Sequence, residues 1–184
     1  VAHDWGGAIA WASLLTDAVR FERFIPMNMP HPGIFRKRIW RPRQFIRSWY
    51  MLFFQLGAVA EEVVAKNEWE FIERLWKDWS PGWAYPQASI QPVKEALSQP
   101  GVLQAVLGYY RCVFQFWTAR GRQSMRLLAR TVSVPTLGLI GESDGCIGPE
   151  FYRLCMQDDI FTHGLLVKTI AGAGHFLQQE KPDV

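Results

Sequence analysis

The stretch V-A-H-D-W-G-G, residues 1–7, decides the fold. Ala2, Asp4 and Gly6 have the spacing of a nucleophile elbow, in which a strand turns sharply into a helix. Small residues on both sides of such a turn let the backbone close up, so that one side chain stands on top of it. The usual nucleophile at that point is serine, whereas here it is a carboxylate. We therefore expect a strand over Val1 and Ala2, a turn that presents Asp4, and a helix directly after it.

An α/β pattern lies on both sides of a long interruption. Apolar residues at helical spacing or in short runs predict helices over 8–20 and 149–157, strands within 24–29, 132–145 and 165–175, and a last helix from 176. Uninterrupted apolar runs of this length are typical of strands in a parallel sheet that is buried on both faces. The two outer parts therefore predict a partial parallel sheet of about three strands.

Residues 33–130, the interruption, are rich in tryptophan and arginine and have helical periods throughout. Turn signals such as Ser80-Pro81-Gly82 separate these periods, and no strand pattern is convincing. We therefore expect an all-helical cap over 33–130, inserted between core segments 1–32 and 131–184.

Composition narrows the class of protein. The chain has 184 residues, 49% of them hydrophobic, which supplies a sizeable core, and its net charge of +3 is too small to indicate nucleic-acid binding. The basic stretch 35–47 is interpreted as a solvated helix face or loop. Three cysteines without metal-ligand spacing predict free thiols in a reducing, cytoplasmic compartment, with no metal and no cofactor. No apolar run is long enough for a membrane span, and no oligomeric state is predicted.

Three polar residues follow predicted strands. Asp4 follows the first strand, Asp144 lies in the loop G-E-S-D-G, and His175 ends the loop G-A-G-H. Loops at the carboxyl edge of a parallel sheet are where such folds build their sites. A helix cap or a plain loop residue would explain each one alone. Together, in the order nucleophile, acid and histidine, they predict the catalytic triad of an α/β-hydrolase.

Further motifs are spread over the chain: NMPHP, SWYMLFFQ, the Tyr-Tyr-Arg of GYYRC, GESDGCIG and GAGHFLQQEKPD. With VAHDWGG, they resemble the epoxide hydrolase family of α/β-hydrolases over essentially the whole chain. The elbow and the histidine loop are shared with haloalkane and fluoroacetate dehalogenases, so the two tyrosine motifs are the more discriminating part. The resemblance implies an α/β-hydrolase core with an inserted helical cap.

The resemblance also implies a reaction in two steps. Asp4 attacks a saturated carbon of a small apolar epoxide and forms an alkyl ester. His175 then activates the water that hydrolyses this ester, and Asp144 orients and supports the imidazolium. The backbone N–H of Trp5, the residue after the nucleophile, is expected to stabilise the oxyanion.

Tyr50 in Ser48-Trp49-Tyr50 and Tyr110 in Tyr109-Tyr110-Arg111 match the two cap tyrosines of that family. The alkoxide that ring opening releases is too basic to leave unaided, and a phenol can give it a hydrogen bond or a proton. The expected partners are therefore an apolar epoxide and water, and the product is a diol.

Two other functions stay open. A halide leaves without a proton, so a tryptophan-rich chain also suits a hydrolytic haloalkane or haloacid dehalogenase on the same scaffold. A non-catalytic ligand-binding α/β-hydrolase is disfavoured because all three triad positions hold competent residues. Asn28 ends a core strand where some relatives keep their acid, but it is an amide, which makes Asp144 the better candidate.

The chain also departs from the family. The strands that precede the elbow in a complete α/β-hydrolase are missing, and so is the His-Gly-x-Pro motif that supplies a second oxyanion N–H. We therefore expect an internal fragment with little or no activity of its own. An unpaired sheet edge favours aggregation, and losing one oxyanion donor costs on the order of a hundredfold in rate.

Overall fold

The computed structural model describes the backbone of residues 1–184 and every side chain except that of Asp158. Its sheet contains four parallel strands in the order β1 (Ala2–His3), β2 (Pro26–Met27), β3 (Thr136–Gly141) and β4 (Leu165–Ile170). The expected number was about three. The fourth strand arises because the residues before the elbow pair with β2 in the register Ala2↔Pro26 and His3↔Met27. Met27 in turn pairs with Leu139 of β3, and β3 pairs with β4 along its whole length.

The rest of the chain is helical. The α-helices are α1 (Asp4–Thr16), α2 (Pro32–Arg38), α3 (Pro42–Arg47), α4 (Trp49–Phe53), α5 (Ala58–Ala65), α6 (Glu70–Trp79), α7 (Gln87–Leu97), α8 (Val102–Val113), α9 (Ala119–Leu127), α10 (Pro149–Cys155) and α11 (Leu177–Glu180). Short 3₁₀ helices span Ala18–Arg20, Phe54–Leu56, Asn67–Trp69 and Asp158–Ile160. Among the described residues, no helix is both long and apolar enough to cross a bilayer.

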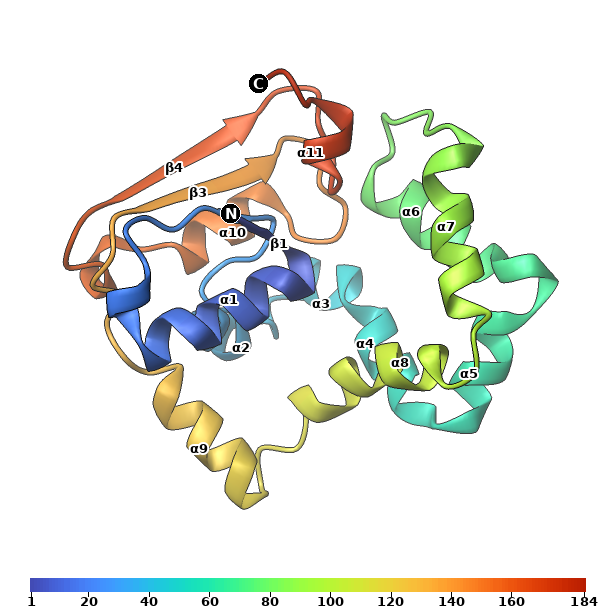
Figure 1. Cartoon of the computed structure of the whole chain (residues 1–184), viewed down its shortest axis with the longest axis horizontal. Coiled ribbons are helices and arrows are strands. Elements are labelled where there is room, and N and C mark those ends of the chain that lie inside the picture. The colour runs from blue at the N-terminus through green and yellow to red at the C-terminus, as the bar shows by residue number, and fades with distance from the viewer.

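Helices α2, α3 and α10 each begin with a proline, whose fixed φ suits the first helical position and whose missing N–H costs nothing there. Residues 33–130 hold helices and no strand within the described structure, as the sequence pattern indicates. Figure 1 shows helices α4 to α8 beyond the carboxyl ends of β3 and β4, whose arrowheads point toward that side of the molecule. The division into a core and a cap at positions 32/33 and 130/131 stays a prediction.

One hydrophobic cluster connects the sheet with these helices. On the sheet side, α1 packs against β1 and β2, and α10 packs against β3. The buried side chains of the cluster include Trp11, Leu14, Ile140 and Tyr152 near the sheet and Phe54, Val64, Leu107 and Tyr110 among the helices beyond it. Because apolar burial is continuous between the two parts, the helices are held firmly over the carboxyl edge of the sheet.

Candidate active site

The elbow places Asp4 at the first position of α1 with a φ of +45°. Residues with a side chain rarely adopt this left-handed backbone, and such strain persists where the surrounding structure over-determines it. After the turn, helix α1 packs closely against Met29 at Gly7, where an added Cβ atom would lie 2.8 Å from the Cβ of Met29. A Cβ at Gly6 would meet no atom within 4 Å in the described chain, so the small residue that packing requires is one position later than expected.

Asp4, His175 and Asp144 come together as one chain of polar contacts. The Nε2 atom of His175 lies 3.5 Å from Oδ1 of Asp4, and its Nδ1 atom lies 3.1 Å from Oδ2 of Asp144. His175 and Asp144 are buried, whereas the Asp4 side chain is 33% exposed toward the cavity above it. The two carboxylates therefore contact opposite nitrogens of the imidazole, and only Asp4 is open to a ligand.

Asp144 is held by hydrogen bonds on both oxygens. Its Oδ1 accepts from the backbone N–H groups of Cys146 at 2.7 Å and Ile147 at 2.9 Å. Its Oδ2 accepts from Nδ2 of Asn28 at 2.5 Å. Asn28 is fully buried and has a φ of +53°. The sequence identified this amide only as a residue that cannot be the acid, whereas the structure makes it a hydrogen-bond donor to the acid.

The charges of the site favour an imidazolium between two carboxylates. Burial by itself would lower the pKa of His175, but the charges of Asp144 and Asp4 and their hydrogen bonds raise it to about 10. Burial would likewise raise the pKa of Asp4. The hydrogen bond and charge of His175 outweigh that effect, and the backbone N–H of Trp5 adds to them, so the pKa of Asp4 is lowered. Asp4 is therefore ionised and available as a nucleophile.

His3, the residue before Asp4, contacts the loop that carries His175. Its Nε2 atom forms a hydrogen bond of 2.8 Å with the backbone carbonyl of His175, and the two rings lie 4.9 Å apart. Burial and the nearby charge of His175 lower the pKa of His3, which keeps its ring neutral. A neutral ring donates the hydrogen bond to the carbonyl without placing a second positive charge beside the imidazolium.

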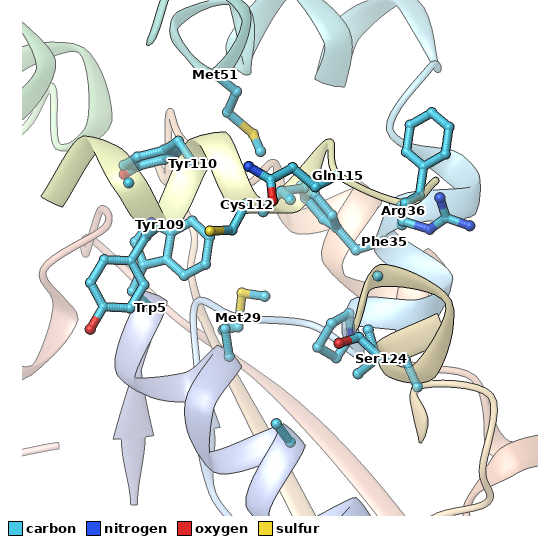
Figure 2. A pocket seen from close by; sticks show the side chains of 18 of the residues that line it. Trp5, Met29, Phe35, Arg36, Met51, Tyr109, Tyr110, Cys112, Gln115 and Ser124 are labelled. Atoms are coloured by element: carbon cyan, nitrogen blue, oxygen red, sulfur yellow. The ribbon is translucent and has the colours of Figure 1, made fainter. Parts of the chain in front are cut away.

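The two candidate tyrosines line a cavity of about 660 Å³ that Asp4 also lines. Tyr50 comes from α4 and Tyr110 from α8, and their rings meet edge to face at 5.7 Å. Burial raises the pKa of both phenols well above its usual value, and the charge of Asp4 adds to this effect in each case. Both hydroxyl groups therefore stay protonated close to the Asp4 carboxylate. Figure 2 shows Tyr110 beside Trp5 and Tyr109 at this end of the cavity.

Cys146 is an unexpected member of the site. Its Sγ atom lies 3.2 Å from the hydroxyl of Tyr50. One potential metal-ligand atom from each of Asp4, Cys146 and His175 lies within 4.8 Å of the other two. Burial raises the pKa of the thiol well above its usual value, which opposes the thiolate that a metal ion would require. That the site works without a metal stays a prediction.

A serine at the end of α6 fastens the histidine loop. The Ser80 hydroxyl oxygen accepts from the backbone N–H of His175 at 2.8 Å and donates to Oε1 of Glu180 at 2.8 Å. The other oxygen of Glu180 accepts from the Gly174 N–H at 2.8 Å. A Cβ at Gly174 would lie 2.6 Å from Ser80, so the two segments touch directly. The sequence marked Ser80 only as part of a turn, because nothing local indicates a partner 95 residues away.

Comparison with known proteins agrees with this architecture. No family model matches the chain. The chain aligns over 98% of its length with a mutant of an epoxide hydrolase from Bacillus megaterium, at a TM-score of 0.73, 23% identity and 63% coverage of that chain. For the Cif epoxide hydrolase from Acinetobacter nosocomialis the TM-score is 0.76, with 17% identity, 98% coverage of this chain and 56% of that one. The fold is that of an α/β-hydrolase, because the chain has a parallel sheet with an aspartate at its elbow and superposes on these solved structures.

Curated relatives of the chain include several epoxide hydrolases. The chain is 31% identical over 193 residues to epoxide hydrolase 4 of Homo sapiens, with coverage of 100% of this chain and 50% of that protein. It is 30% identical over 192 residues to epoxide hydrolase 1 of Caenorhabditis elegans, with coverage of 100% and 45%. The chain thus spans about half the length of the curated relatives it matches.

Proposed function

We propose that this chain carries the reacting groups of an epoxide hydrolase, which opens an apolar epoxide to a diol through an ester on Asp4. The observation that carries the proposal is that two protonated phenols, Tyr50 and Tyr110, line the same cavity as an ionised aspartate. The similarity to epoxide hydrolases supports it.

In the first step, a carboxylate oxygen of Asp4 attacks a ring carbon and a C–O ester bond forms. The ring C–O bond breaks, and its electron pair stays on the oxygen. Tyr50 or Tyr110 gives this oxygen a proton and is left as a phenolate. General acid catalysis of this kind contributes roughly 10²–10⁴-fold to a rate.

The second step depends on a change in the charge of Asp4. Esterification removes the negative charge of Asp4, and with it one of the two carboxylates that raise the pKa of His175 to about 10. The pKa of His175 therefore falls, and the imidazolium gives its Nε2 proton to the phenolate, which restores the tyrosine. The free Nε2 atom can then take a proton from water while Asp144 holds Nδ1. Ester formation thus converts the imidazolium of the resting site into a base.

The resulting hydroxide attacks the ester carbonyl, and the backbone N–H of Trp5 stabilises the oxyanion. When the tetrahedral intermediate collapses, His175 returns its proton to the departing diol oxygen. The acid group left on Asp4 ionises, and its proton passes to His175, which restores the imidazolium between the two carboxylates. The sum of both steps is epoxide plus water to diol, with the oxygen of the water retained on Asp4.

A dehalogenase is the alternative on the same scaffold, and the indole of Trp5 does line the cavity. A halide leaves without a proton, however, so such an enzyme would have no use for two buried phenols. A binding protein without catalysis would have no use for the strained, ionised aspartate.

The test follows a single turnover by mass spectrometry. Ester formation uses Asp4 and the two tyrosines. Hydrolysis also needs hydrogen-bond donors to the oxyanion, of which we assign one, the Trp5 N–H. Because a single donor supports hydrolysis poorly, multiple turnovers are expected to be slow, and a single turnover is the sharper measurement. With styrene oxide in ¹⁸O-labelled water, we expect an adduct of the full epoxide mass on the Asp4 peptide. Hydrolysis should then leave ¹⁸O on Asp4 and none in the diol.

The Asp4→Asn variant is the control and should form no adduct. Halide release from a haloalkane, with an alkyl adduct on Asp4 and no reaction with the epoxide, would establish the dehalogenase instead. Absence of any adduct from either substrate class would overturn both enzymatic functions in favour of ligand binding.

A further inference from the structure

Helix α3 binds the backbone of the loop that carries Asp144. The Nε2 atom of Gln44 donates to the carbonyl of Cys146 at 2.9 Å, and Oε1 of the same side chain accepts from the N–H of Gly148 at 3.3 Å. Three positions further along the helix, Arg47 donates to the carbonyl of Asp144 at 3.3 Å. Three backbone groups of this loop are therefore held by two side chains of one helix.

Gln44 is buried in a helix that is otherwise mostly exposed. Its neighbours Phe45 and Ile46 are exposed, whereas Gln44 is 2% exposed. Its Nε2 atom also donates to the hydroxyl oxygen of Ser48 at 3.0 Å. Because a backbone carbonyl can only accept and a backbone N–H can only donate, the contacts with the loop fix the orientation of the amide. The basic stretch of the sequence is interpreted as a solvated face or loop, whereas this one member is directed into the protein.

The peptide group between Cys146 and Ile147 connects Gln44 with the acid. Its carbonyl accepts from Gln44, and its N–H, that of Ile147, donates to Oδ1 of Asp144 at 2.9 Å. Hydrogen bonds that follow one another in this way polarise and strengthen each other. Oδ2 of Asp144 in turn contacts Nδ1 of His175 at 3.1 Å. One line of hydrogen bonds therefore runs from α3 to the imidazole.

The carbonyl of Cys146 depends on Gln44. Cys146 is buried, and no other donor in the described structure reaches its carbonyl. Removal of the Gln44 amide would leave this carbonyl without a partner, which is costly inside a protein. A rotation of the peptide group would relieve that cost and would carry the N–H of Ile147 away from Asp144. The position of the acid therefore depends on the amide at position 44.

We propose that Gln44 is a positioning residue, which holds Asp144 against His175 through the peptide group that it binds. Asp144 supports the imidazolium that forms while the Asp4 ester is hydrolysed. Gln44 therefore acts on the second step of the cycle, through Asp144 and without contact to the substrate. The effect on rates rests on the proposed function, whereas the effect on the contact between Asp144 and His175 does not.

The test uses Gln44→Met, which keeps the length of the side chain and removes both polar atoms. We expect the Nδ1 proton of His175 to move upfield in the NMR spectrum, because its hydrogen bond to Asp144 lengthens. In single turnovers with styrene oxide, rapid-quench mass spectrometry should show hydrolysis of the Asp4 ester slowed by about tenfold, since a buried hydrogen bond is lost. Ester formation should change little, because the N–H of Ser48 keeps its bond to the backbone carbonyl of position 44 in any variant.

Gln91→Met is the matched control. Gln91 is exposed, and its amide likewise contacts the side chain four residues later, that of Glu95. The control should change neither the resonance nor the two rates. An unmoved Nδ1 proton in Gln44→Met would overturn the inference, and so would an equal slowing of both steps. If the resonance moves but styrene oxide leaves no ester on Asp4, the positioning role stands and the proposed function fails.

The unaltered protein offers a second measurement, which applies even where Gln44→Met does not fold. Hydrogen exchange followed by NMR should show slow exchange of both side-chain amide protons of Gln44, because each faces an acceptor in the protein. The backbone N–H of Ile147 should be protected as well, since it donates to a buried carboxylate. Fast exchange of the Gln44 amide would mean that its bond to the loop is not maintained, and the inference would then be wrong.

Discussion

In the proposed function, Tyr50 and Tyr110 favour an alkoxide over a halide as the leaving group at Asp4. The double variant with Tyr50→Phe and Tyr110→Phe removes both hydroxyl groups and keeps the apolar packing of the rings. We expect ester formation from styrene oxide to slow by roughly 10²-fold or more, because the opened ring then loses both phenol proton donors. Rapid-quench mass spectrometry measures this rate. Tyr85→Phe, a tyrosine outside the cavity, is the control, and a double variant that reacts as fast as Tyr85→Phe would refute the assignment.

Asp4 controls the protonation of His175 in the proposed cycle. Asp4→Asn has the shape of the carboxyl group without its charge and so imitates the electrostatic effect of the ester. We expect the pKa of His175 to fall from about 10, because one of the two carboxylates that stabilise its imidazolium is gone. Nitrogen-15 NMR of the imidazole measures the titration, and Glu150→Gln on the exposed side of α10 is the control. An unchanged pKa in Asp4→Asn would mean that ester formation does not activate the base.

At the residue scale, the sequence predicts those site residues that lie in recognisable local motifs. Asp4, Asp144 and His175 are predicted because each follows a strand and has small residues close by in the sequence, and the structure brings all three together. Asn28 and Cys146 were not predicted to contact the site residues. Their roles depend on contacts between segments more than ninety residues apart, which no local pattern encodes.

At the scale of elements, the end of α6 connects the helices beyond the sheet to the loops that carry Asp144 and His175. The backbone carbonyl of Trp79 accepts from the N–H groups of Gly145 and His175, and Ser80 accepts from His175 as well. These bonds fix the loops that carry the acid and the histidine to a single helix end. The position of the imidazole therefore depends on the helical region as well as on the sheet.

Ser80→Ala tests this connection. Ser80 is buried, so its loss should reduce the free energy of unfolding by on the order of 1–3 kcal/mol, because Glu180 and two backbone N–H groups lose a partner. Hydrolysis of the Asp4 ester should slow more than its formation, since in the proposed cycle His175 acts as a base only in hydrolysis. Single-turnover rates of the two steps give that ratio, with the exposed Ser98→Ala as the control. A uniform slowing of both steps would contradict a positioning role for Ser80.

Element boundaries were harder to predict than element types. The apolar run 24–29 became a strand only at Pro26–Met27, because Phe24 makes an isolated bridge to Thr136 and Asn28 turns into a left-handed conformation. The first helix begins at Asp4 rather than at residue 8, since the elbow residues themselves are helical. Long-range pairing and turn geometry override local periodicity in both places.

At the scale of the whole molecule, His31 links stability to pH. It is 2% exposed, packs edge to face against Trp11 at 5.1 Å, and has no hydrogen-bond partner on either ring nitrogen. Burial, with a contribution from the charge of Lys37, lowers its pKa to about 4 from 6.5. The folded protein therefore keeps this ring neutral over a range of pH in which the unfolded chain protonates it.

The sign of the effect follows from this difference. Between pH 6.5 and about 4 the unfolded chain binds the extra proton at His31, so the stability that this residue contributes above pH 6.5 is lost as the pH falls. The difference in pKa corresponds to a loss on the order of 3 kcal/mol.

Replacing the ring in His31→Phe should remove this part of the pH dependence. Urea unfolding at several pH values from 7.5 to 4 measures the free energy of unfolding of the unaltered protein and of His31→Phe. The difference between the two should shift steadily in favour of His31→Phe as the pH falls. The exposed His163→Gln serves as the control. Parallel curves for the unaltered protein and His31→Phe would show that the buried imidazole is protonated in the folded state or solvated by a partner that the protein supplies.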